Sequence, residues 1–129
     1  MPQEGLSEDI RRFLRLHVNS IEQLEILLRL NAIAPQSESS AAIASALYLS
    51  PESVEARLNA YVQKGVVLRS SGSPAQYELK HDPGIRRHID SLAKLYRERR
   101  VSIINEIFSN PNDAIQTFAD AFIIGRKKE

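Results

Sequence analysis

Residues 39–79 read SSAAIASALYLSPESVEARLNAYVQKGVVLRSSGSPAQYEL and contain the signals that decide the fold. Ser39 is a suitable N-cap for a helix over 40–47, because a serine hydroxyl satisfies a backbone N–H that the first helical turn leaves unpaired. The preceding segment, 34–38, is rich in turn-forming residues and predicts a loop. We expect the helix to bury Ile43, Ala44 and Leu47.

A second helix start follows at Ser50 and Pro51. Serine caps the helix, and proline suits its first position, where the missing N–H costs nothing. Gly65 is the expected end, because glycine adopts the left-handed conformation that commonly closes a helix. The pattern predicts a helix over 51–64 whose inward face carries Val54, Leu58, Tyr61 and Val62.

Two short strands are expected next, over 66–70 and 75–79, joined by the turn SGSP. The second strand alternates, with Tyr77 and Leu79 directed to the core and the residues between them directed outward. Two short helices around a tight turn, followed by a hairpin, are the order of a winged helix-turn-helix. We therefore expect a mainly α fold with a small β-hairpin, extended by C-terminal helices.

The flanking sequence divides around this motif. Residues 1–19 predict an N-terminal helical segment, since Ser7 can cap a helix whose apolar residues have the spacing of one helical face: Ile10, Phe13 and Leu14. A strongly apolar helix from residue 21 begins the winged helix-turn-helix domain, which we place at 20–80. The remaining residues, 81–129, predict C-terminal helices.

The C-terminal part carries more apolar surface than a chain this short can cover. Asp82 caps a long helix that we expect to continue through Arg99 and Arg100 until Pro111 breaks it. Residues 101–108 are apolar around nearly the whole circumference, and such a helix must be covered on both sides. We therefore expect a homodimer, with a dimer surface formed by Val101, Ile104, Ile107, Phe108, Ile115, Phe118 and Phe122.

Composition limits the classes of function that remain open. The 129 residues include 17 Lys and Arg against 16 Asp and Glu, so the net charge of +1 indicates neither a nucleic-acid nor a membrane partner by itself. There is no cysteine, which fits a reducing compartment. The polar N-terminus lacks the apolar segment of a signal peptide, and no apolar run approaches the length of a membrane span. We expect a cytoplasmic protein with no membrane contact.

The motif also resembles a known family. The run I43-A44-x-x-L47-x-L49-S50-x-x-x-V54-x-x-x-L58-x-x-x-V62-x-x-G65-V66-V67 is similar to the core of bacterial winged helix-turn-helix transcription regulators, broadly of the MarR and PadR type. The resemblance covers residues 20–80. It implies double-stranded DNA binding as a dimer, with helix 51–64 in the major groove and the wing, residues 69–76, on the DNA backbone.

Candidate DNA contacts follow from the helix geometry and the wing. Asn59 and Gln63 have amide groups that match the edge of adenine, and Arg57 can reach guanine or phosphate. Cationic and hydroxyl side chains on the wing suit phosphate oxygens. The full set of expected DNA-binding residues is Ser53, Arg57, Asn59, Gln63, Lys64, Arg69, Ser71, Gln76 and Lys80.

The same helix face supports an alternative. Glu52 and Glu55 repel phosphates, and the small residues Ala56 and Ala60 form a groove into which a protein can pack. Because phosphate neutralisation supplies most non-specific affinity for DNA, this face contributes little of it. A winged-helix module that docks a protein partner is therefore the second hypothesis.

The sequence predicts neither a metal site nor a catalytic site. His17, His81 and His88 lack the spacing of metal ligands. Nucleophile elbows, phosphate-binding loops and paired catalytic carboxylates are absent from the sequence. We expect no cofactor, no metal site and no enzymatic activity.

Overall fold

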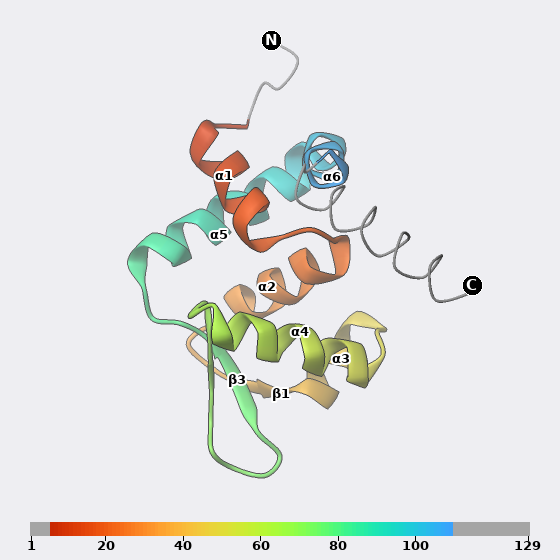
Figure 1. Cartoon of the computed structure of the whole chain (residues 1–129), viewed down its shortest axis with the longest axis vertical. Helices are drawn as coiled ribbons and strands as arrows, with labels where there is room; N and C mark the ends of the chain where they lie inside the picture. Colours follow the sequence, from red (N-terminus) through yellow and green to blue (C-terminus); the bar gives the residue numbers. More distant parts are fainter. Residues whose placement is uncertain (1–5, 110–129) are drawn as a thin grey trace, which may run out of the picture. The chain divides into compact units, whose positions relative to one another are not determined.

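A computed structural model of the chain describes residues 6–109 as helices and a small sheet (Figure 1). The helices are α1 (Glu8–His17), α2 (Ile21–Ile33), α3 (Ser40–Leu47), α4 (Pro51–Gln63), α5 (Pro83–Glu98) and α6 (Arg100–Phe108). The strands are β1 (Glu38–Ser39), β2 (Val67–Arg69) and β3 (Gln76–Leu79). The mainly α winged helix-turn-helix with a C-terminal helical extension is therefore confirmed.

Contacts divide the chain into two compact units. One spans Glu22–Lys94 and contains the helix-turn-helix, the sheet and most of α5. Within the described residues, the other combines 6–21 with 95–109. The boundaries expected from sequence, after residues 19 and 80, stay predictions.

Serine caps begin both helices of the helix-turn-helix, as the sequence predicts. The Ser39 hydroxyl accepts a hydrogen bond from the Ala42 N–H at 3.2 Å, and the Ser50 hydroxyl accepts one from the Ser53 N–H at 3.3 Å. Gly65 follows α4 with φ of +79°, the left-handed conformation expected of it. Local side-chain and backbone preferences thus place α3 and α4 where the sequence predicts them.

The turn between α3 and α4 depends on an unusual residue. Tyr48 has φ 59° and ψ 45°, and it is the one non-glycine residue with positive φ between residues 6 and 109. Its backbone N–H and that of Leu49 both donate to the Ala44 carbonyl, the Leu49 bond being 2.9 Å long. The left-handed step closes α3 and redirects the chain into the cap of α4.

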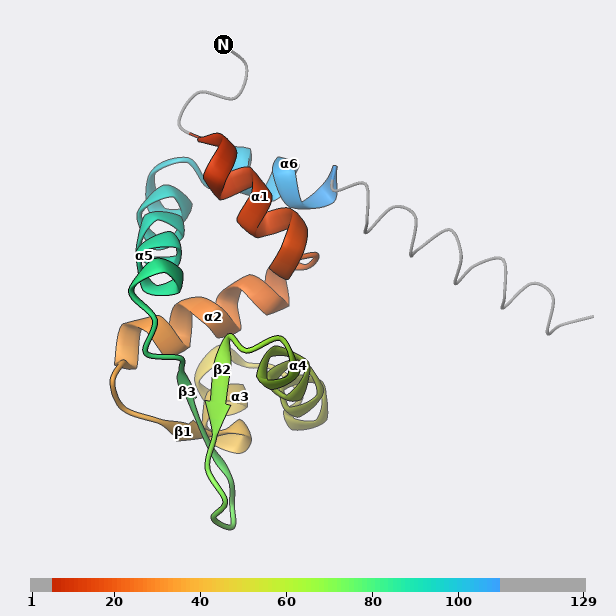
Figure 2. The same ribbon diagram turned by 60° about the vertical axis from the view of Figure 1, so that its left-hand side comes forward.

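The sheet has three antiparallel strands in the order β1-β3-β2, one more than the expected hairpin (Figures 1 and 2). In the hairpin of β2 and β3, Val67 lies opposite Leu79 and Arg69 opposite Tyr77, and the burial of β3 alternates as predicted. The loop expected over 34–38 is wrong at its end, because Glu38 pairs with Tyr77 to form β1. A two-residue strand is too short to show alternation, and its partner is distant in the sequence.

A single apolar core fills the Glu22–Lys94 unit. The inward positions predicted for α4 are buried at Val54, Leu58 and Tyr61, whereas Val62 and Leu47 are half-buried. Helix α2 buries residues on more than one face, which explains its strongly apolar composition. The buried apolar side chains are Leu24, Ile26, Leu27, Leu30, Ile43, Ala44, Val54, Leu58, Tyr61, Val66, Val67, Tyr77, Leu79, Ile89 and Leu92.

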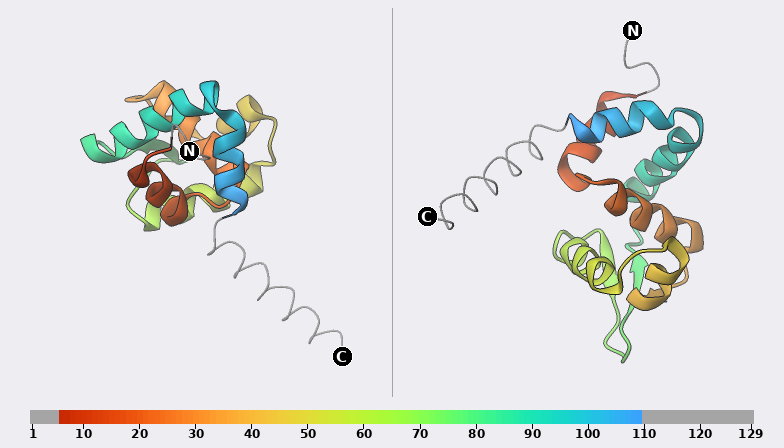
Figure 3. Two further views of the ribbon diagram at one scale, coloured as in Figure 1. Left: turned by 90° about the horizontal axis from the view of Figure 1, so that it is seen from above. Right: turned by 90° about the vertical axis from the view of Figure 1, so that its right-hand side faces the viewer.

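In the other unit, α1 and α6 lie side by side (Figure 3). Ser7 caps α1 as predicted, and the expected apolar face is buried. The single long helix expected through Arg99 is wrong, because Arg99 leaves the helical conformation with φ −136° and ψ 53°. Helix α6 therefore starts anew, and it buries Ile103 and Ile107 in a unit where its contacts are with α1.

Candidate nucleic-acid interface

The solvent-facing side of α4 carries small and acidic side chains. Glu52, Glu55, Ala56, Ala60 and Gln63 are all exposed, and Lys64 is exposed directly after the helix. The Glu52 pKa lies below its ordinary value, because the carboxylate accepts hydrogen bonds from its own backbone N–H and from the Ser50 hydroxyl, the latter at 3.0 Å. Glu52 is therefore negatively charged at neutral pH, in the first turn of α4.

Two of the predicted DNA contacts, Ser53 and Arg57, are directed to α2 and are only partly exposed. The Arg57 Nε lies 3.1 Å from Glu22 Oε2, and the Ser53 hydroxyl donates to the same carboxylate oxygen. The Arg57 and Glu22 side chains are 31% and 24% exposed. Glu22 was not among the sequence-predicted site residues, since nothing local indicates that the first turn of α2 meets α4.

Asn59 joins the helix to the wing. The Tyr77 hydroxyl donates to Asn59 Oδ1 at 3.2 Å, and the Tyr77 ring is buried. The contact orients the Asn59 amide and ties α4 to β3. Because an amide oxygen has a second lone pair and the amide nitrogen two protons, Asn59 keeps the groups needed to read a base edge.

Tyr61, on the inward side of α4, stays a neutral phenol. Burial raises its pKa above the ordinary value of 10, and the nearby Arg57 opposes that shift. The buried side of α4 therefore carries no charge at Tyr61.

The predicted wing residues are mostly accessible. Arg69 is exposed, and its guanidinium lies 5.9 Å from the centre of the Tyr77 ring. Ser71 is at the exposed tip, where the Ser70 hydroxyl accepts the Gln76 N–H at 2.9 Å and holds the hairpin closed. Gln76 is half-buried, and Lys80 is exposed beyond the end of β3. The predicted contact residues thus provide two exposed cations, Arg69 and Lys80, and the exposed hydroxyl of Ser71.

Comparison with known proteins agrees with this geometry. The chain matches no family model and no curated protein. It is similar in structure to MepR, a transcription regulator of the Staphylococcus aureus multidrug efflux pump MepA, with a TM-score of 0.55, 14% identity, and coverage of 95% of this chain and 89% of that one. A MarR family protein from Bacillus stearothermophilus gives a TM-score of 0.50 and 15% identity, covering 95% of this chain and 84% of that one. The fold is that of MarR-type winged-helix proteins.

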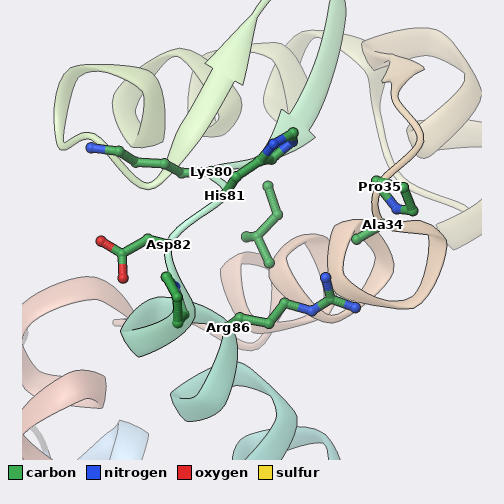
Figure 4. A pocket seen from close by; sticks show the side chains of 8 residues that line it. Ala34, Pro35, Lys80, His81, Asp82 and Arg86 are labelled. Carbon is green, nitrogen blue, oxygen red and sulfur yellow. The ribbon is translucent and has the colours of Figure 1, made fainter.

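A cavity of about 290 Å³ opens in this MarR-type fold beside the segment that joins β3 to α5 (Figure 4). Arg86 extends toward Ala34 and Pro35, whereas Asp82 is directed the other way (Figure 4). The Asp82 carboxylate caps α5, accepting the Gly84 N–H at 2.8 Å and the Ile85 N–H at 3.2 Å. The remaining lining residues are Leu79, Lys80, His81 and Pro83.

The described part of the expected dimer surface lies on α6. Val101 and Phe108 are 69% and 68% exposed, Ile104 is half-buried and Ile107 is buried within the chain. Ile107 therefore packs beneath the expected dimer surface and is not part of it. The other three expected residues, Ile115, Phe118 and Phe122, lie outside the described residues.

Residues 6–109 contain neither a metal-binding cluster nor a membrane-spanning helix. No group of three His, Asp or Glu side chains in this range is arranged to hold a metal ion. None of the helices in the same range is long and apolar enough to cross a membrane.

Proposed function

We propose that this chain is a DNA-binding transcription regulator that acts as a homodimer. Helix α4 enters the major groove, and the wing, residues 69–76, lies on the DNA backbone. The observation that supports this most is the Tyr77–Asn59 hydrogen bond, which joins the reading helix to the wing within a MarR-type fold. MepR, which shares that fold, is a transcription regulator.

The proposed contacts differ in kind. Asn59 and Gln63 read base edges, because an amide can donate to N7 and accept from N6 of adenine. Arg69, Ser71, Gln76 and Lys80 bind phosphates and set the position of the protein on the duplex. Lys64, at the end of α4, adds a further phosphate contact. Ser53 and Arg57 reach DNA only when they leave Glu22.

The test is fluorescence anisotropy with DNA selected from a random library, starting near 50 mM salt, where phosphate contacts are strong. Arg69→Ala should weaken binding to every sequence and lower the slope of log K against log salt by about 0.9, the value for one lost phosphate contact. Gln63→Ala should instead cost about 1–3 kcal/mol at one base pair and leave the slope unchanged. Arg12→Ala, which removes an exposed cation from α1, is the matched control. Absence of binding at low salt would refute the proposal.

The dimer is tested separately. Two large apolar side chains on one short helix, Val101 and Phe108, are the described surface that a second copy would cover. Light scattering at micromolar concentration should report a dimer, and Phe108→Asp should report a monomer. Leu68→Asp, which places the same charge on a partly exposed leucine of β2, should leave the dimer intact.

The acidic exposed face of α4 favours a second candidate function, docking of a protein partner. Glu52 and Glu55 disfavour phosphate, and Ala56 and Ala60 leave a shallow surface into which a partner's side chains would pack. In that case a stoichiometric partner should co-purify with the chain and be lost on Ala56→Arg. If α4 reads DNA, the same substitution adds a cation to the groove-facing side and should not release any protein.

A further inference from the structure

We propose that the carboxylate of Glu22 holds Arg57 away from DNA and thereby limits the number of phosphates that the chain neutralises. We call this Glu22–Arg57 contact the latch. The inference rests on the proposed DNA-binding function and concerns the regulation of the same interface. Glu22 lies in the first turn of α2, whereas Ser53 and Arg57 lie on α4.

The geometry brings one carboxylate to two donors. Ser53 and Arg57 are four positions apart on α4 and therefore project from the same side of the helix. Glu22 Oε2 meets both, accepting the Ser53 hydroxyl and lying 3.1 Å from Arg57 Nε. One acidic side chain thus holds both predicted contacts of the first half of α4 against α2.

The contact with Arg57 is electrostatic and poorly directed. Although Arg57 Nε is 3.1 Å from the carboxylate, its N–H has no properly aligned acceptor, and the nitrogen is buried. A guanidinium held by charge, without an aligned hydrogen bond, loses little directional bonding when it turns outward. At 31% exposure the Arg57 side chain already reaches the surface, so its release needs a side-chain rotation and no movement of the helix.

The latch changes the net charge that α4 presents to a phosphate backbone. Its exposed face carries Glu52 and Glu55, and Arg57 is the only cation within the helix. While Glu22 neutralises Arg57, the helix presents net negative charge to a phosphate backbone. Releasing Arg57 adds one positive charge where α4 would approach a strand, which changes both the affinity and its salt dependence.

Glu22→Gln removes the negative charge of residue 22 and keeps the shape of its side chain. Glutamine keeps an oxygen that accepts the Ser53 hydroxyl and fills nearly the same volume, but it has no charge to hold Arg57. Glu55→Gln is the matched control, since it removes the same charge from the exposed face of α4, away from the Glu22 contact. Circular dichroism melts of each full-length variant verify that it is folded.

The experiment is a salt series of DNA affinities for wild type, Glu22→Gln, Arg57→Gln, Glu55→Gln and the two double variants with Arg57→Gln. For Glu22→Gln we expect tighter binding and a slope of log K against log salt steeper by about 0.9, the value for one additional phosphate. Both changes should disappear in Glu22→Gln/Arg57→Gln. Glu55→Gln should tighten binding to the same extent with or without Arg57.

The outcomes distinguish the latch from the proposed function. Wild-type binding with an unchanged Glu22→Gln slope, or a gain that persists without Arg57, would overturn the latch alone. Absence of DNA binding in wild type and in every variant would overturn both. If Glu22→Gln does not fold, Arg57→Gln decides: the latch predicts a wild-type slope, whereas a loss of about 0.9 means that Arg57 already contacts a phosphate.

Discussion

Replacing Tyr48 by glycine should make the protein more stable, although it removes a large side chain. Tyr48 closes α3 in the left-handed conformation, with φ 59° and ψ 45°, and its side chain is 94% exposed. The left-handed region costs an L-residue about 1–2 kcal/mol, because Cβ approaches the following carbonyl oxygen. At this level of exposure, burial of the tyrosine side chain contributes almost nothing to the free energy of unfolding.

The expected gain is the difference between two backbone terms. Glycine avoids the steric cost but loses more conformational freedom on folding, at about 0.5–1 kcal/mol. Tyr48→Gly should therefore raise the free energy of unfolding by about 0.5–1 kcal/mol. The melting temperature should rise by about 2–5 °C. Tyr48→Ala keeps both Cβ and the strain, so its stability should stay close to that of wild type.

Urea denaturation followed by circular dichroism measures the effect. We expect a higher midpoint for Tyr48→Gly with the same slope m, which identifies a change of stability and not of denatured-state compactness. If Tyr48→Gly is no more stable than Tyr48→Ala, the left-handed strain is not the quantity that governs this turn. A decrease for both variants would mean that the tyrosine side chain contributes to the fold despite its exposure.

Three further predictions concern the elements around the interface. Tyr77→Phe removes the hydroxyl that donates to Asn59 and should lower the free energy of unfolding by about 1 kcal/mol, as measured by urea denaturation; an unchanged midpoint would contradict it. Asp82→Ala removes the cap of α5 and should cost about 1 kcal/mol, which Asp82→Asn should largely restore. Because the Glu52 pKa is lower in the folded state, its stabilising effect is present above the ordinary value of 4.5 and lost as pH falls through the lower folded value. Glu52→Gln should therefore be less stable than wild type at pH 7, and thermal melts should show the two converging in acid.

Much of the wing was predictable because its strands carry a short-range pattern. The alternation of Tyr77 and Leu79 with outward residues is visible in the sequence and is observed in the burial of β3. The exposure of Lys80 follows from the same alternation and that of Ser71 from the turn. Arg69 does not follow it, because it lies opposite the buried Tyr77 and β2 does not alternate in burial. By contrast, the direction of Arg57 was not predictable, since helical periodicity places it at the border between the inward and outward faces. At such a border, the neighbouring helix decides where a long side chain goes.

The sequence by itself determined what depends on interactions within about four residues. The Ser39 and Ser50 caps and the left-handed Gly65 are of this kind, and they define the helix-turn-helix. Only the tertiary structure decided the pairing of Glu38 with Tyr77 and the meeting of Glu22 with Ser53, which is 31 residues away. Such pairs leave no periodic trace, because their distance depends on how whole elements pack and not on the local conformation of either partner.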